Sequence, residues 1–506
     1  MRNIRTVVLV TAALLGSSLA GTTAAAAAPH VCGGGSHPQA NVNTSCHGGG
    51  NYFETSLAIN PLNPGNVIGA VIKLARTPGQ NSLAVEPRAS FDGGATWVTA
   101  AVHYAAGQPA VDPSLAFDAF GTAYLVTTNN GDIVLVRSTD GGLTWSSPLP
   151  VAPGSLGAQG GVFNDHPQMT AFGLGGVIVT WIRDVFGTDG NLVEAPVYDS
   201  VSHDGGTTWS PPQSVSGSAS FCTGHQGGHA CDQTFGNSVA FLRGRAVVTF
   251  QQTTDEAPDA GSALGRDKYL SVLIEPFTGT KVAGPFLIGQ AYDGQTEHDY
   301  PVSAGGVQTV HDSEFNLDGM GNTAVDPTDR SGRHFAIVWY DDRNAPHPVN
   351  SDPYQATTNA DVIVSQSRDG GRTWSSPAAI QRPNDQFMPW AAYDQQGRLR
   401  IGFFDRSYDP ANHKYGYTLA TEVTPGSLTF TFAQVTTALS DPTRDSTASR
   451  GTINPRFPNP TVSIGDYTAV AAGPTSIATM WTDLRVKGCV NGRCGFTENA
   501  FFANMP

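Results

Sequence analysis

The stretch Ser90-Phe-Asp-Gly-Gly-Ala-Thr-Trp97 decides the fold, because the chain repeats it three more times. The other copies are Ser138–Trp145 (STDGGLTW), Ser202–Trp209 (SHDGGTTW) and Ser367–Trp374 (SRDGGRTW). Six of the eight positions are the same in all four copies. Self-similarity of this kind indicates a fold that is built from repeated units.

The chemistry of the motif predicts a hairpin turn. An aspartate can accept hydrogen bonds from turn amides, and glycines adopt positive φ without steric cost. The tryptophan offers a large apolar face that can hold the hairpin against its neighbours. Each copy follows a strand-like run such as Ile133–Val136. We therefore expect the four motif aspartates to be structural rather than catalytic: Asp92, Asp140, Asp204 and Asp369.

The motif is the Asp box, or BNR repeat, and through it the chain resembles the sialidase superfamily and its propeller relatives. The resemblance implies an all-β propeller of four-stranded antiparallel blades, with each box at the turn between the third and fourth strands. With the box as a ruler, seven units can be counted. They begin at Glu54, Asp112, Asp165, Asp232, about Asn316, Asp385 and Asp466. Seven blades is the first choice and six the alternative, because sialidases themselves have six.

The chain is expected to form one domain after a cleaved leader. Residues 1–28 carry Arg2 and Arg5, an apolar run and a string of alanines, which is the order of a secretory signal peptide. Residues 29–50 form an N-terminal segment rich in cysteine and glycine, and residues 51–506 form the propeller. No later segment has the roughly 20 apolar residues that a membrane span requires. A secreted, extracellular protein follows, and we expect a monomer.

The charge of the chain restricts its partners. The formal net charge is −14 at pH 7, and only 14% of residues are charged. Nucleic acids and anionic membranes both select basic surfaces, so neither is expected as a partner. Carbohydrate is the expected partner instead, and no cofactor is required for that.

The six cysteines fall into three close pairs, Cys32 with Cys46, Cys222 with Cys231, and Cys489 with Cys494. An even number of cysteines in an exported protein favours disulfides. Six cysteines allow 15 connectivities, so this pairing is a preference based on proximity. Metal binding is the alternative for the second pair, because His225 and His229 lie between its cysteines.

The box also predicts which face carries a functional site. In a four-stranded blade, the turn between strands three and four lies opposite two other connections: the loop between strands two and three, and the link to the next blade. Three long segments, 253–268, 291–315 and 344–360, fall on that second face. Rigid scaffolds place binding residues on such loops.

An aromatic–acid–arginine pattern recurs at the ends of the second strands. It appears in Trp339-Tyr-Asp-Asp-Arg343, Phe403-Phe-Asp-Arg406 and Met480-Trp-Thr-Asp-Leu-Arg485, and reordered in Trp181-Ile-Arg-Asp184. Arginines in a ring would bind a carboxylate or sulfate, with aromatic rings stacked on sugar faces. The alternative is a set of Asp–Arg ion pairs between blades, which the repetition of the pattern favours.

The blade openings form a second ring, of carboxylates: Glu54, Asp112, Asp165, Asp232, Asp385 and Asp466. Crowded carboxylates repel one another unless they are protonated, hydrogen-bonded or holding a cation. Structural Ca²⁺ is a candidate because calcium accepts several oxygen ligands. His166, His298 and Asp299 depart from strict repetition, so each is of individual interest.

The sialidase resemblance implies three arginines that bind a substrate carboxylate, an aspartate as acid/base, and a tyrosine nucleophile activated by glutamate. The Arg-Ile-Pro motif that normally precedes the first box is absent, and Arg76-Thr-Pro78 and Pro87-Arg88 are the nearest stretches. Carried onto this chain, the hypothesis is an anion clamp with Asp165 or Asp299 as the acid/base and Tyr467 or Tyr340 as the nucleophile. The clamp would consist of Arg343, Arg406 and Arg485, with Arg183 and His166 as further substrate-binding residues.

Three functions therefore compete. The first is a glycoside hydrolase of exo-sialidase type that acts on sialic or other acidic sugars. The second is a non-catalytic propeller that binds glycans or proteins, since one fold serves many functions. The third is a polysaccharide lyase, which would need a tyrosine or histidine base beside a group that neutralises the substrate carboxylate.

Overall fold

A computed structural model describes most of the chain after residue 30. The described residues are 31–33, 41–46, 50–77, 80–104, 107–157, 160–222, 224, 228–253, 267–292, 300–304, 307–317, 320–346, 352, 354–444, 463–490 and 493–506. The expected signal peptide at 1–28, and His225, His298 and Asp299, lie outside them. Within the described part, no helix has the length and apolarity to cross a bilayer.

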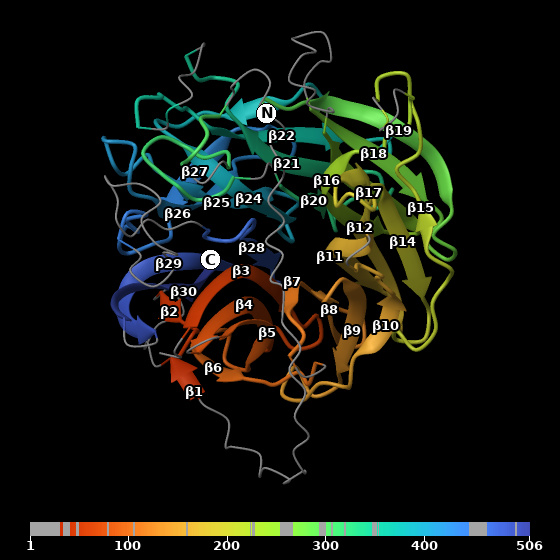
Figure 1. Cartoon of the computed structure of the whole chain (residues 1–506), viewed down its shortest axis with the longest axis horizontal. Coiled ribbons are helices and arrows are strands. Elements are labelled where there is room, and N and C mark those ends of the chain that lie inside the picture. The colour runs from red at the N-terminus through yellow and green to blue at the C-terminus, as the bar shows by residue number, and fades with distance from the viewer. Residues whose placement is uncertain are drawn as a thin grey trace.

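Seven antiparallel sheets surround one central axis, so the expected propeller is confirmed with seven blades and not six (Figure 1). Blade A contains β3 (Gly50–Ile59), β4 (Val67–Thr77), β5 (Gln80–Ser90) and β6 (Thr96–Thr99). Blade B contains β7 (Ala110–Phe117), β8 (Ala123–Asn129), β9 (Asp132–Ser138) and β10 (Leu149–Ala152). Blade C contains β11 (Gly161–Phe172), β12 (Gly176–Phe186), β13 (Leu192–Glu194), β14 (Val197–Ser202) and β15 (Gln213–Ser214).

The remaining blades follow the same order. Blade D contains β16 (Thr234–Leu242), β17 (Arg245–Gln252), β18 (Lys268–Ile274) and β19 (Lys281–Gln290). Blade E contains β20 (Thr323–Val325), β21 (Phe335–Asp341), β22 (Asp361–Ser367) and β23 (Ala378–Ile380). Blade F contains β24 (Gln386–Tyr393), β25 (Leu399–Asp405), β26 (Gly416–Glu422) and β27 (Phe430–Gln434). Blade G contains β28 (Ala469–Ala472), β29 (Ile477–Val490) and β30 (Arg493–Met505).

The N-terminal segment closes the ring. Blade G takes its outermost strand from β2 (Val42–Asn43), which pairs with β30 so that Val42 lies opposite Phe502. β1 (Val31–Gly33) adds a fifth strand to blade A beside β6. The first and last blades therefore lie side by side (Figure 1). The segment that composition marked only as rich in cysteine and glycine thus contributes strands to the propeller.

Side chains of the inner strands join each blade to the next. Ser56 Oγ on β3 accepts a hydrogen bond from the Leu115 amide at 3.1 Å, and Ser238 Oγ on β16 accepts one from the Thr323 amide at 3.0 Å. The other five junctions use the same kind of bond, from a hydroxyl or amide side chain to a backbone group of the neighbouring blade: Ser114 with Met169, Asn237 with His166, Asn322 with Ala391, Thr468 with Met388, and Thr55 with Met480. Small polar residues on the inner strands thus provide a contact at every junction.

The Asp boxes form the turns between the third and fourth strands, as predicted. In the third box, Asp204 accepts hydrogen bonds from the Thr208 hydroxyl at 2.6 Å and the Thr208 amide at 2.8 Å. These bonds lower the pKa of Asp204 to about 2. Ser202 Oγ accepts a hydrogen bond from the Gly206 amide, and the Trp209 indole donates one to the Gly206 carbonyl. The aspartate is therefore occupied by the turn, which agrees with a structural role.

The second glycine of each box packs against the preceding blade. A Cβ on Gly94 would lie 1.9 Å from a ring carbon of Phe502 on blade G, and one on Gly206 would lie 2.7 Å from Leu135 on blade B. Both glycines also have positive φ. Glycine is required for two reasons, the turn conformation and the close approach of the preceding blade.

Two of the expected disulfides are present, Cys32–Cys46 and Cys222–Cys231. Cys494 is also disulfide-bonded, and Cys489 is the residue directly opposite it across the β29–β30 hairpin. The second pair is therefore a stapled loop rather than a metal site. Disulfides are typical of proteins that reach an oxidising compartment.

Substituting Gly94 with Ala tests the role of the second glycine. Positive φ alone costs a non-glycine residue about 1–2 kcal/mol, and overpacking against Phe502 adds about 1–3 kcal/mol. Gly190→Ala is the matched control, because Gly190 has φ of 76° and nothing within 4 Å of its added Cβ. Chemical unfolding should show a clearly larger loss for Gly94→Ala, and equal losses would contradict the packing argument.

A buried carboxyl group on β14 has no hydrogen-bond partner among the described residues. Asp199 is 0% exposed, and neither of its carboxylate oxygens bonds to a described residue. Burial raises the pKa of Asp199 from 3.8 to about 8. A carboxyl group whose pKa is higher in the folded state binds more protons there than in the unfolded chain. It therefore reduces stability as the pH rises from about 4 to about 8.

The variant Asp199→Asn should flatten this pH dependence, because asparagine keeps the shape of the protonated acid and cannot ionise. Thermal unfolding midpoints of wild type and Asp199→Asn should be measured from pH 3.8 to about pH 8. The two midpoints should be similar at the acid end, and the variant should have the higher midpoint at the alkaline end. Asp132→Asn, which removes an exposed carboxylate, should not reproduce the effect. Parallel curves for wild type and Asp199→Asn would disprove the assignment.

Candidate functional site

Strand registers place the blade openings and the arginine-bearing strand ends on one face. In blade C, Asn164 near the start of β11 pairs with Arg183 near the end of β12. In blade F, Gln386 at the start of β24 pairs with Asp405 at the end of β25. The Asp boxes follow the opposite ends of the third strands. The face assignment made from the box motif therefore agrees with the registers.

Backbone irregularities set the blade openings at the mouth of the central channel. The registers of β3, β7 and β11 each shift at the opening, next to Glu54, Asp112 and His166. These three residues have φ of 51°, 56° and 46°, a region that non-glycine residues seldom adopt. Bulges of this kind often redirect side chains near functional sites. Here they bring polar side chains from separate blades together.

A fourth opening, at blade G, approaches through a glycine. Gly465 has φ of 83°, and a Cβ there would lie 2.6 Å from the Glu54 amide nitrogen. Only glycine allows the chain to pass this close to blade A. It brings Asp466 and Tyr467, the next two residues, beside Glu54, whose charge acts on both.

The resulting cluster contains four carboxyl groups, one imidazole and one phenol: Glu54, Asp112, Asp165, His166, Asp466 and Tyr467. His166 lies between two of the acids, with Nδ1 3.7 Å from Asp112 and Nε2 3.7 Å from Asp165. Both distances are longer than a hydrogen bond. The Asp165 side chain is 24% exposed, and those of Asp112 and His166 are 6% and 7% exposed. Asp165 is thus the most accessible of these three side chains.

Burial and mutual repulsion favour protons on the cluster. Burial, followed by the charges of Asp466 and Asp112, raises the pKa of Glu54 well above its ordinary range. Burial also raises the pKa of Asp165, with a further rise from Asp112 and an opposing effect of His166. Burial and the Glu54 carboxylate raise the pKa of Tyr467. Neighbouring carboxyl groups that share protons in this way occur in several classes of active site.

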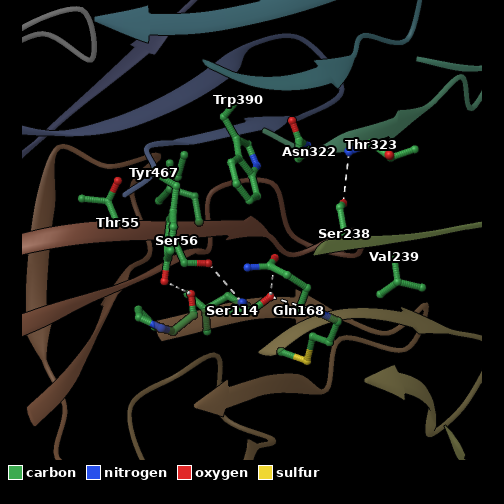
Figure 2. A pocket seen from close by; sticks show the side chains of 15 residues that line it. Thr55, Ser56, Ser114, Gln168, Ser238, Val239, Asn322, Thr323, Trp390 and Tyr467 are labelled. Atoms are coloured by element: carbon green, nitrogen blue, oxygen red, sulfur yellow. Dashed lines mark hydrogen bonds between the residues drawn. The ribbon is translucent and has the colours of Figure 1, made fainter. Parts of the chain in front are cut away.

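A small cavity adjoins the cluster through Tyr467, which lines its wall (Figure 2). Its volume is about 140 Å³, which exceeds one water molecule and falls below the usual volume of a ligand pocket. Inner strands of all seven blades line it, and the Tyr467 and Trp390 rings on one side are 5.7 Å apart. Ser56, Ser114, Gln168, Ser238, Asn322 and Thr323 are among the polar residues on its wall. One tryptophan face amid hydroxyl and amide groups is chemistry that suits a sugar.

Two of the three arginines proposed as a clamp are held by their own strands. The Arg343 guanidinium bonds to both oxygens of Asp341, at 2.8 and 2.7 Å, and the Arg485 guanidinium bonds to both oxygens of Asp483, at 2.8 and 2.6 Å. In each strand the tryptophan indole donates to the same aspartate. The recurring pattern is thus a local structural unit within a strand end, and not an ion pair between blades.

Arg406, the third arginine of the proposed clamp, is buried and has different partners from the other two. It is 0% exposed, and it bonds to Asp385, to Ser313 Oγ and to the carbonyls of His311 and Asn412. These contacts attach the segment 307–317 to blade F. The clamp hypothesis would require these bonds to open, and the channel-mouth cluster does not include any of the three arginines.

The other proposed residues occupy different environments. The Arg183 guanidinium lies 5.3 Å from the centre of the Tyr198 ring. Tyr340 is 0% exposed within the apolar core. Asp165, His166 and Tyr467, which the sequence placed on two different blades, meet in the cluster. The sequence identified Glu54, Asp112 and Asp466 only as members of a ring of blade openings. In the structure, the bulges in β3 and β7 and the close approach of Gly465 bring these three acids together.

No known family profile and no curated protein matches the chain. Among solved structures, the chain is similar to a protein of unknown function from Dyadobacter fermentans, at 12% identity over 80% of this chain and 97% of the other, with a TM-score of 0.47. It is similar to Hadza microbial sialidase Hz136, at 14% identity over 72% and 65% of the two chains and a TM-score of 0.41. It is also similar to a PL25 ulvan lyase, at 12% identity over 76% and 78% and a TM-score of 0.41. At this level the likenesses assign neither a family nor an activity.

The variant Arg406→Ala should act on stability first. Removing one partner of a buried ion pair costs about 3–5 kcal/mol, because the other charge stays buried without compensation. Arg343→Ala removes an arginine whose side chain is 17% exposed and should cost less. Urea unfolding of both variants tests the comparison. Equal stability of wild type and Arg406→Ala would show that the arginine is not structural.

Proposed function

We propose that the protein is a secreted glycan-processing enzyme, an exo-glycosidase of sialidase type, whose active site is the channel-mouth cluster. The observation that carries the proposal is that Asp165 from blade C, Tyr467 from blade G and Glu54 from blade A lie within reach of one another's charge. They are the acid, phenol and carboxylate that the sialidase resemblance implies. Each comes from a different blade.

The roles follow from position. Asp165, the accessible acid, would donate a proton to the glycosidic oxygen as the bond to the anomeric carbon breaks. The Tyr467 oxygen would attack that carbon, and its proton would pass to Glu54. In the second step Asp165, now ionised, would take a proton from water as the water oxygen displaces Tyr467, and the Tyr467 oxygen would recover its proton from Glu54. The two steps retain the anomeric configuration, as in a double displacement.

The cavity supports an exo-acting mode. At about 140 Å³ the cavity is smaller than the usual ligand pocket, so it would receive no more than one terminal sugar unit. The Trp390 ring and the surrounding amide and hydroxyl groups could then contact one terminal residue. Acidic sugars are the class that the resemblance predicts. The mouth is rich in carboxyl groups, and like charges repel, so neutral sugars belong in the same substrate panel.

The proposal also covers removal of the signal peptide and the state of the mature protein. The disulfides agree with export, and we propose that residues 1–28 are removed as a signal peptide and that residues 29–50 remain, because β1 and β2 lie among them. The mature protein would be an extracellular monomer. N-terminal sequencing of secreted protein and its mass in solution would test both points.

Turnover of fluorogenic glycosides tests the site. Asp165→Asn and Tyr467→Phe should each lower kcat by at least about 100-fold, the usual minimum contribution of a positioned acid or base. Asp189→Asn, an exposed acid in the loop between β12 and β13, is the matched control and should keep wild-type rates.

The panel of test substrates should include sialosides, uronic-acid glycans and neutral glycosides. Full activity of Asp165→Asn and Tyr467→Phe in an active protein would exclude this site. Unsaturated products from uronic-acid glycans would indicate a lyase. Glycan binding without turnover of any substrate would indicate a binding propeller.

A further inference from the structure

The channel mouth holds a group of side chains with the spacing of metal ligands. One oxygen each from Asp112 and Asp165 and one ring nitrogen of His166 lie within 4.8 Å of one another. Ligand atoms about 2.0–2.2 Å from one ion are separated by roughly 3–4 Å. Whichever ring nitrogen of His166 binds the ion, it lies 3.7 Å from one aspartate, Asp112 for Nδ1 or Asp165 for Nε2, and the oxygen of the other aspartate is within 4.8 Å. The 3.7 Å distances fall in the range of ligand pairs. They are too long for hydrogen bonds and leave room for an ion.

A second observation concerns a neighbouring carboxyl group. Glu54 is only 6% exposed, and its Oε2 accepts no hydrogen bond from any described residue. The charges of Asp466, Asp112 and Asp165 act on Glu54, and its carboxyl group also hydrogen-bonds to that of Asp112, so it faces the same cluster. A buried carboxylate oxygen without a donor is costly unless a proton or a cation satisfies it. A dication bound by the two aspartates would lie beside it.

We propose that Asp112, Asp165 and His166, with Glu54 beside them, bind one divalent cation at the channel mouth. The donor set selects the class of ion. Imidazole nitrogen with carboxylates suits Mn²⁺ or Zn²⁺, whereas Ca²⁺ takes oxygen ligands. The site therefore differs from the calcium that a ring of blade-opening carboxylates would bind.

Three blades contribute to this site, and that arrangement gives the cation a structural effect. Glu54, Asp112 and the Asp165–His166 pair open blades A, B and C. An ion that binds all of them would link three consecutive inner strands at the face where their bulges lie. Because a ligand that binds only the folded state stabilises it, the thermal unfolding midpoint should rise with the concentration of the metal.

The inference goes beyond the proposed function and does not depend on it. Asp165 is the proton donor in the hydrolytic proposal and a ligand here, so a loaded cation and hydrolysis exclude each other. We expect saturating Mn²⁺ or Zn²⁺ to inhibit turnover. Metal binding is measured without any substrate, so failure of one proposal is distinguishable from failure of the other.

The experiment is a titration of chelator-treated mature protein with Mn²⁺, followed by the electron paramagnetic resonance signal of free Mn²⁺. Wild type should bind one ion per chain, and Zn²⁺ should displace it more readily than Ca²⁺. Asp112→Asn should bind at least about 10-fold more weakly, because loss of groups at metal sites commonly costs 10- to 100-fold in affinity. Asp189→Asn, on the same face outside the cluster, should bind as wild type does.

A second variant separates ligation from folding. His166→Asp replaces the nitrogen donor with oxygen, and aspartate tolerates the positive φ at this position. Its affinity for Zn²⁺ should fall while its affinity for Ca²⁺ rises, a reversal that general destabilisation cannot produce. Failure of wild type to bind Mn²⁺ at millimolar concentration would overturn the proposal. Equal affinity of wild type and Asp112→Asn, or an unchanged order of ions in His166→Asp, would also overturn it.

Discussion

The structure depends on closing a ring of seven sheets. Each inner strand has a neighbour within its own blade on one side only, and the channel lies on the other. At every junction a hydroxyl or amide side chain bonds to the backbone of the adjacent blade, as Ser56 does with Leu115. The last junction also receives β2, so chain segments 456 residues apart share a hydrogen bond between Thr44 and Ala500. Pairing of β2 with blade G therefore fixes the first blade next to the last.

Closure of the ring also creates the chemistry of the mouth. Glu54 and Tyr467 belong to opposite ends of the chain, and only a closed ring brings their charges together. The bulges at the openings turn Asp112 and His166 toward the same point. Burial then disfavours charge on each acid, and the proximity of the others adds repulsion. A proton or a metal ion would relieve this repulsion, so both proposals concern the same physical problem.

The arginines show how one sequence pattern can be consistent with two structures. Trp339, Asp341 and Arg343 alternate along β21 and its end, so an arginine ring that faces a ligand was a reasonable hypothesis. The distances favour a local role, because Asp341 accepts both the arginine and the indole. An aspartate two residues before an arginine at a strand end can bind it without help from another blade. Composition and spacing do not distinguish this geometry from a binding site.

By itself the sequence determined what depends on local chemistry. Four copies of one turn motif specified hairpins, because hydrogen bonds within eight residues define each turn. The propeller class, the strand positions and the face opposite the boxes were what the resemblance of this motif to the Asp box implied. Proximity in sequence also identified the disulfide partners. Only the tertiary structure decided which blade openings converge, that residues 42–43 complete the last blade, and that Arg406 anchors the 307–317 segment. These contacts join residues that are more than 50 positions apart, and the convergence of the openings depends on bulges and on Gly465, whose effects appear only when the ring is closed.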